Sequence, residues 1–76
     1  MKLMTRDQCR AARTLLHMTQ PQLANRVGCS LTTLVNYELD RRYVTDEMIQ
    51  SIQRALEKAG AIFIDGNGVR LQRNRK

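Results

Sequence analysis

Residues 19–38 read TQPQLANRVGCSLTTLVNYE, and this stretch decides the fold. Its first residue, Thr19, stands three positions before Gln22, which is the spacing of a capping box at the start of a helix. Pro21 falls in the first turn, where a missing amide hydrogen costs nothing. The pattern therefore predicts a helix over residues 20–27.

A short turn joins that helix to a second one. Gly28 suits the left-handed conformation in which helices commonly end, because it has no Cβ. Ser30 is a good N-cap for a helix over residues 31–39. A connection of about three residues that contains glycine is typical of two helices meeting at a steep angle.

Helices are also predicted on both sides of this pair. Thr5 and Gln8 repeat the capping-box spacing and predict a helix over residues 6–17. Thr45 is the N-cap of a longer helix over residues 46–59, which Gly60 ends. The apolar face of the first of these helices consists of Cys9, Ala12, Leu15 and Leu16, and that of the second consists of Met48, Ile49, Ile52, Ala55, Leu56 and Ala59.

The segment 61–72 has the pattern of a β-hairpin, with apolar runs on either side of the turn residues 65–68. A loop of two or of four residues gives the same register, which pairs Ile64 with Val69. An isolated hairpin is marginal in water, so this one must pack on a helix or on another chain. The predicted register puts Ile62, Ile64, Val69 and Leu71 on one face, and Phe63 and Arg70 on the other.

Composition agrees with a small, mainly α-helical domain. The chain has 76 residues with few aromatic side chains, so its core must rest on aliphatic residues. Its net charge is +6, and such an excess on so small a surface attracts polyanions. We expect one domain over residues 1–60, the hairpin over 61–72 and a basic tail over 73–76.

Several classes of protein are disfavoured. No apolar run is long enough for a membrane span, and no signal peptide is recognisable. Cys9 and Cys29 lack the CxxC spacing of a metal site and His17 is the single histidine, so we expect no metal and treat both cysteines as small buried apolar residues. No partner for His17 and no phosphate-cradling glycine loop is evident, so we expect neither enzyme activity nor a cofactor.

One spaced pattern runs through both central helices: Thr19-Gln20-x-x-Leu23-Ala24-x-x-Val27-Gly28-x-Ser30-x-x-Thr33-Leu34-x-x-Tyr37-Glu38. It resembles the helix-turn-helix of the Cro/C1-type (Xre) family of bacterial and phage regulators. The resemblance covers about residues 10–56. It implies a four-helix, lambda repressor-like domain that binds double-stranded DNA in the cytoplasm and regulates transcription, most often as a repressor.

The resemblance also implies roles for single residues, because the second helix of the motif enters the major groove in that family. Leu34 and Tyr37 are expected on the buried side of this helix, flanked by Leu31 or Leu39. The opposite side carries short side chains and an asparagine that can pair with adenine. The alternatives are purely structural: Gln20 only caps, Thr32 only starts a helix, Thr33 only packs, and the two arginines form a solvated loop. The expected base contacts are Leu31, Thr32, Val35 and Asn36, and the expected phosphate contacts are Gln20, Thr33, Arg41 and Arg42.

Two further expectations concern positions at the end of the second motif helix. Glu38 is expected to be structural, paired with Arg10 or Arg13. Asp40 stands where the family commonly has a glycine, and this is the clearest departure from the pattern.

The expected partners of the chain are DNA and a second copy of the chain. One recognition helix reads few bases, so a homodimer on an inverted repeat is expected, with the hairpin residues Ile62, Ile64, Val69 and Leu71 as the dimerisation element. The alternative for the hairpin is packing within the chain, on the first or the fourth helix. The alternative function is an antitoxin, or another protein-interaction module with a toxin or co-regulator as partner, that represses its own promoter.

Overall fold

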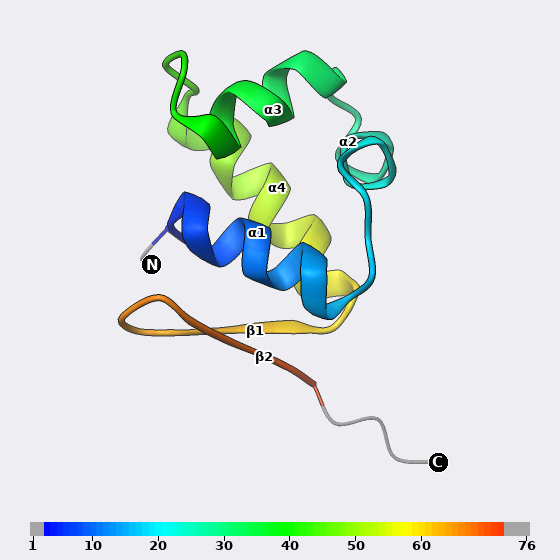
Figure 1. Cartoon of the computed structure of the whole chain (residues 1–76), viewed down its shortest axis with the longest axis vertical. Coiled ribbons are helices and arrows are strands. Elements are labelled where there is room, and N and C mark those ends of the chain that lie inside the picture. Colours follow the sequence, from blue (N-terminus) through cyan, green and yellow to red (C-terminus); the bar gives the residue numbers. More distant parts are fainter. Residues whose placement is uncertain (1–2, 73–76) are drawn as a thin grey trace.

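Four helices followed by a two-stranded antiparallel hairpin make up residues 3–72, the part of the chain that the computed structural model describes (Figure 1). The predicted basic tail, 73–76, lies outside the described residues. The mainly α-helical class is confirmed. The helices are α1 (Arg6–Leu15), α2 (Gln20–Val27), α3 (Leu31–Leu39) and α4 (Asp46–Lys58), and the strands are β1 (Ala61–Ile64) and β2 (Gly68–Leu71).

Side-chain caps begin all four helices, as the sequence predicts. Complete capping boxes join Thr5 with Gln8 and Thr19 with Gln22. The hydroxyl of Ser30 accepts the amide hydrogen of Thr33, and Thr45 does the same at the start of α4. Each cap satisfies an amide that has no partner within its helix, which explains why these starts could be located to the residue.

Helix α1 ends two residues earlier than expected, at Leu15 instead of about His17. His17 has a φ of 56°, in the left-handed region. Its amide donates to the Thr14 carbonyl at 3.1 Å, and the amide of Met18 donates to the Arg13 carbonyl at 2.8 Å. This is the hydrogen-bond pattern of a Schellman motif, which normally has glycine at the left-handed position.

Replacing His17 by glycine is expected to stabilise the fold. The substitution relieves the clash of a Cβ in left-handed backbone, although the extra freedom of glycine in the unfolded chain offsets part of this gain. We expect about 0.5–1 kcal/mol in the free energy of unfolding, or roughly 2–8 °C in Tm. Thermal melting of the His17→Gly and His17→Ala variants tests this, because alanine keeps the Cβ. An equal Tm for both variants would contradict the explanation.

The core lies between the four helices and the inner face of the hairpin. On α4 the predicted apolar stripe is confirmed, with Ile52 and Leu56 fully buried. Two expectations are wrong: Leu15, the last residue of α1, is 41% exposed, and neither Leu31 nor Leu39 flanks the buried side of α3. The buried apolar residues are Met4, Cys9, Ala12, Met18, Leu23, Ala24, Leu34, Tyr37, Ile52, Leu56 and Ala61.

The hairpin register is one residue away from the one expected. Phe63 pairs with Val69 and Ile64 with Gly68, so the loop has three residues, Asp65–Asn67. Gly66 and Asn67 both have positive φ, which allows this odd-numbered turn. A shift of one residue moves side chains to the other face of a strand. Val69 and Leu71 therefore lie on the same face as Ala61 and Phe63, whereas Ile62 and Ile64 lie on the other.

The inner face of the hairpin packs on the chain's own helices. Phe63 and Val69 contact the core, with β2 against α1 and β1 against α4. Gln8 fixes the turn: its side-chain amide donates to the carbonyls of Ile64 and Gly68, both at 2.9 Å. The Thr5 hydroxyl bonds to the side chain of Asn67. The inner face of the hairpin is thus covered by the chain's own helices, which is the alternative that the sequence left open.

No helix within residues 3–72 is both long and apolar enough to cross a membrane. Cys9 is fully buried, and Cys29 is partly buried against the core. Burial raises the pKa of both thiols, and for Cys9 the nearby Glu38 carboxylate adds to this effect.

Candidate nucleic-acid interface

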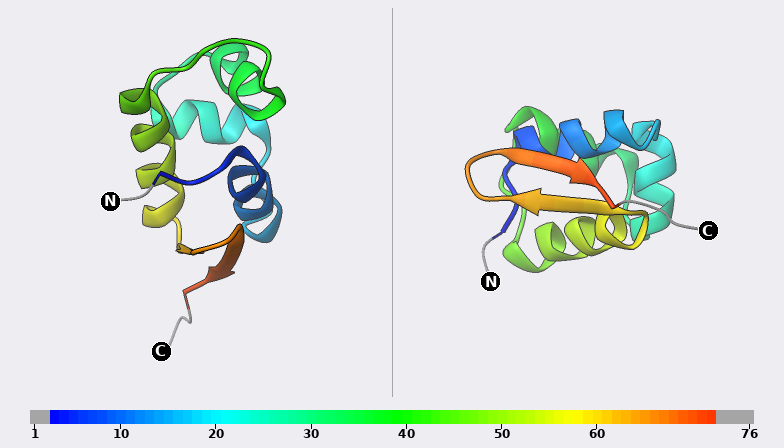
Figure 2. Two further views of the ribbon diagram at one scale, coloured as in Figure 1. Left: turned by 90° about the vertical axis from the view of Figure 1, so that its left-hand side faces the viewer. Right: turned by 90° about the horizontal axis from the view of Figure 1, so that it is seen from below.

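Helix α3 lies at the end of the molecule opposite the hairpin (Figures 1 and 2). Leu34, Tyr37 and Glu38 fix its inner side in the core. Its other side is open to solvent, with Leu31 at 43% exposure and Thr32 also exposed. A helix held by one side and bare on the other has the form needed to enter a groove.

The four expected base-contacting residues are not equally accessible. Leu31 and Thr32 are exposed, whereas Val35 and Asn36 are partly buried. No hydrogen bond engages the side chain of Asn36 within the described residues, so its amide can reach an outside partner. Thr33 is occupied: its hydroxyl lies 2.9 Å from that of Ser30 in the N-cap. A hydrogen bond to the N-cap is therefore the contact that the Thr33 hydroxyl makes in the structure.

Glu38 organises the base of the motif from a position with only 1% of its side chain exposed. Arg13 of α1 donates to both of its carboxylate oxygens at 2.7 Å, as one of the two pairings expected from the sequence. Arg10 donates instead to the Glu38 backbone carbonyl. The thiol of Cys9 lies 3.5 Å from Oε2. These contacts tie α3 to α1 through one buried carboxylate.

The charge of this buried carboxylate is maintained by its donors. Burial by itself would raise the pKa of Glu38, but hydrogen bonds from Arg13 and Gln20 outweigh it and hold the pKa below its ordinary value. The same bond to Glu38 raises the pKa of Arg13. Both partners are therefore ionised at neutral pH, and a charge-assisted bidentate pair of this kind is geometrically specific.

Gln20, an expected phosphate contact, belongs to the same network. Its side-chain amide donates to Glu38 Oε1 at 3.0 Å, across the start of α2. Gln22, not Gln20, completes the capping box. The structural alternative in which Gln20 only caps is therefore wrong, because its side chain bonds to Glu38 of α3. This contact was not expected from the sequence, because no local pattern relates Gln20 to Glu38, which lies 18 positions further along the chain.

The loop after α3 carries the other two expected phosphate contacts, Arg41 and Arg42, both exposed. Asp40 precedes them with a φ of 55°, in the left-handed conformation that a glycine adopts at lower cost. Its carboxylate pairs with Arg6 at 2.8 Å. Asp40 thus adopts the left-handed conformation at the end of α3, where the Arg41 amide donates to the Asn36 carbonyl at 3.0 Å.

Tyr43 in this loop was missed by the sequence reasoning. It is 85% exposed, the highest value among the large apolar side chains that stand out at the surface. Its position directly after two arginines was the available indication, since aromatic rings beside basic residues suit contact with nucleic acid. It extends the exposed surface from α3 into the loop.

Comparison with protein families agrees with this geometry. The helix-turn-helix family model matches residues 10–62, which is most of the chain and includes all four helices from the middle of α1 onward. The chain belongs to the Cro/C1-type helix-turn-helix family. Among the curated proteins compared with the chain, none matches. Membership makes this helix-turn-helix chain a DNA-binding transcription regulator.

Proposed function

We propose that the chain is a sequence-specific repressor that inserts α3 into the major groove of its operator. The observation that supports this most is the accessible side of α3, which presents Thr32 and the unengaged amide of Asn36. Asparagine can bond adenine through two hydrogen bonds, and a threonine methyl can contact the methyl group of thymine. The exposed Arg41 and Arg42 would neutralise phosphates at the end of the helix.

Asn36→Ala is expected to lower affinity for the selected operator by about 1–3 kcal/mol and to relax base preference at one position. The reason is the loss of a bidentate contact to a base edge. Fluorescence anisotropy with the operator and with point-substituted operators measures both effects. Arg41→Ala is the comparison: it should weaken binding to all sequences and reduce the salt slope by about one. Equal losses on operator and random DNA for Asn36→Ala would refute its role as a base reader.

We also propose that the operator-binding form is a homodimer joined through the hairpin. Face-to-face packing of two hairpins would place the two α3 helices on opposite sides of the dimer, because α3 and the hairpin lie at opposite ends (Figure 2). Pairing by a strand edge keeps both helices on one side. Half-sites one helical turn apart then require the two α3 helices to lie roughly 34 Å from each other.

Single cysteines on the outer face of the hairpin test this arrangement. Arg70→Cys lies near the middle of β2, and Ile62→Cys is its partner across the hairpin on β1. In an edge-paired dimer the central residues of one strand face each other within disulfide distance. We expect mild oxidation to cross-link only one of the two variants, in a chain that is dimeric by light scattering. Cross-linking of both or of neither would contradict edge pairing.

We further infer that the chain is not an enzyme and acts in the cytoplasm of a bacterium or an infecting phage's host. His17 is exposed in the turn after α1, with no hydrogen bond from its side chain to a described residue. The alternative function, an antitoxin that represses its own promoter, stays a prediction. Co-purification of a toxin polypeptide with the tagged chain, in a complex that still binds the operator, is the result that would favour it.

A further inference from the structure

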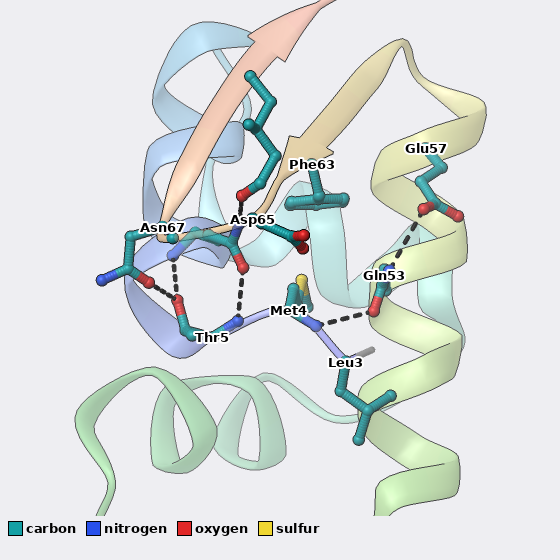
Figure 3. Close-up of a pocket in the computed structure, with 11 residues that line it drawn as sticks. Leu3, Met4, Thr5, Gln53, Glu57, Phe63, Asp65 and Asn67 are labelled. Atoms are coloured by element: carbon teal, nitrogen blue, oxygen red, sulfur yellow. Dashed lines mark hydrogen bonds between the residues drawn. The ribbon is translucent and has the colours of Figure 1, made fainter. Parts of the chain in front are cut away.

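A half-open cavity of about 440 Å³ lies between the N-terminal segment, α4 and the hairpin turn (Figure 3). It is on the part of the molecule that carries the hairpin, away from the exposed side of α3. Its volume falls within the range of small-molecule sites, roughly 300–1,000 Å³. The proposed DNA contacts are not among its lining residues.

The inner part of the cavity is apolar and held in place by buried hydrogen bonds. Met4 is 5% exposed, and the partly buried ring of Phe63 faces the same space. Gln53, also 5% exposed, accepts the Met4 amide hydrogen at 3.0 Å, and its own amide donates to Glu57 at 3.3 Å. These contacts join the N-terminal segment to α4, so the cavity is present before any ligand arrives.

The charged residues that line the cavity are both acidic. Glu57 enters from α4, and Asp65 enters from the hairpin turn with its carboxylate directed toward α4 (Figure 3). Asp65 makes no ion pair with a described residue. Two carboxylates beside an apolar floor are unusual in a chain whose net charge is +6. They favour cations over the anions that the rest of the protein attracts.

We propose that this cavity binds a small organic cation, an ammonium or guanidinium group on a short apolar body. The apolar body lies on Met4 and Phe63, and the cationic group lies between Asp65 and Glu57. The face of the Phe63 ring adds a cation–π contribution. None of the proposed DNA contacts lines this cavity, so a failure of the cation site would leave the proposed base and phosphate contacts of α3 and its loop untouched.

Titration with 2-phenylethylammonium, followed by ¹⁵N NMR of the full chain, tests the proposal. We expect saturable shifts in the Gln53 side-chain amide and in the backbone amides of Gly66 and Asn67. The neutral isostere 2-phenylethanol should bind about tenfold more weakly, and phenylacetate should not bind. The Asp65→Asn variant should lose about fivefold in affinity for the ammonium probe, the upper range for an exposed ion pair.

Glu47→Gln is the matched control, because it removes the same charge at an exposed position outside the cavity. It should leave the affinity unchanged. The spectra of both variants also report whether they are folded. Equal binding of the ammonium and the alcohol, or equal affinity of the Asp65→Asn and Glu47→Gln variants, would overturn the proposal, as would the absence of saturable shifts in the cavity.

Discussion

Arg13→Met is expected to lower the free energy of unfolding at pH 7 by about 3 kcal/mol, because it leaves a buried carboxylate without its charged partner. Glu38 is 1% exposed and would keep only the amide of Gln20 and the thiol of Cys9 as donors. Methionine retains the apolar stem of the arginine, so the loss reports the ion pair and the weaker hydrogen bond from Arg13 to the Met18 carbonyl, and not the packing. A loss of this size is a large fraction of the total free energy of unfolding of a small domain.

In Arg13→Met, the contribution of Glu38 to the free energy of unfolding should change with pH in the opposite direction to its contribution in the wild type. In the wild type the pKa of Glu38 lies below its ordinary value of 4.5, so the stabilisation is complete above pH 4.5 and is lost as the pH falls through the folded-state pKa. Without Arg13, burial raises this pKa, and the folded variant gains stability as Glu38 takes up a proton. The difference between the two proteins should therefore narrow from pH 7 to pH 4.

Urea denaturation at both pH values measures this difference. Arg26→Met is the control, because Arg26 is exposed in the last turn of α2 and pairs with no described acid. It should change stability by less than about 0.5 kcal/mol. A deficit for Arg13→Met that is small at pH 7, or equal at pH 7 and pH 4, would contradict the role assigned to Glu38.

Thr32→Glu is expected to lower operator affinity by about 100-fold or more while the fold stays intact. Thr32 is exposed in the first turn of α3, where a carboxylate is favourable for the helix dipole. In the complex that carboxylate would lie among the phosphates and base edges of DNA, and like charges in an interface cost several kcal/mol. Anisotropy titrations of operator DNA, with melting curves of the same samples, separate binding from stability.

Gln50→Glu makes the same change of charge on the exposed part of α4. It should weaken binding only slightly, through the lower net charge, and more so at low salt. If both variants lost affinity equally, α3 would not be the surface that enters the groove.

The helices could be predicted because their starts depend on local chemistry. Each cap joins residues three positions apart, so it can be recognised in the sequence without knowing the rest of the fold. Examples are Thr19 with Gln22 and Ser30 with Thr33. The end of α1 was less clear, since His17 takes a left-handed conformation that its residue type rarely adopts. Helix ends that lack glycine give little indication in the sequence.

The hairpin register could not be predicted from its apolar pattern. Loops of two and four residues give one register and a loop of three gives the other, and both put apolar residues on each face. The choice depends on Gln8, whose amide bonds the carbonyls of Ile64 and Gly68, and on the left-handed Asn67. The hydrogen bonds of Gln8 join residues that are more than 50 positions apart in the chain.

The candidate DNA interface was predictable as far as the motif extends. The exposed positions Leu31 and Thr32 and the pairing of Glu38 with α1 agree with the pattern. The contact between Gln20 and Glu38 and the exposure of Tyr43 required the structure, because each depends on how separate elements meet.

The most direct test of the central claim is selection of bound duplexes from a randomised DNA library at physiological salt. A homodimer that inserts two α3 helices predicts an enriched inverted repeat, with half-sites about one helical turn apart. Asn36→Ala should lose preference at one base pair in each half-site. Recovery of no motif, with binding that vanishes as salt rises, would contradict sequence-specific recognition and leave only nonspecific attraction between a basic domain and DNA.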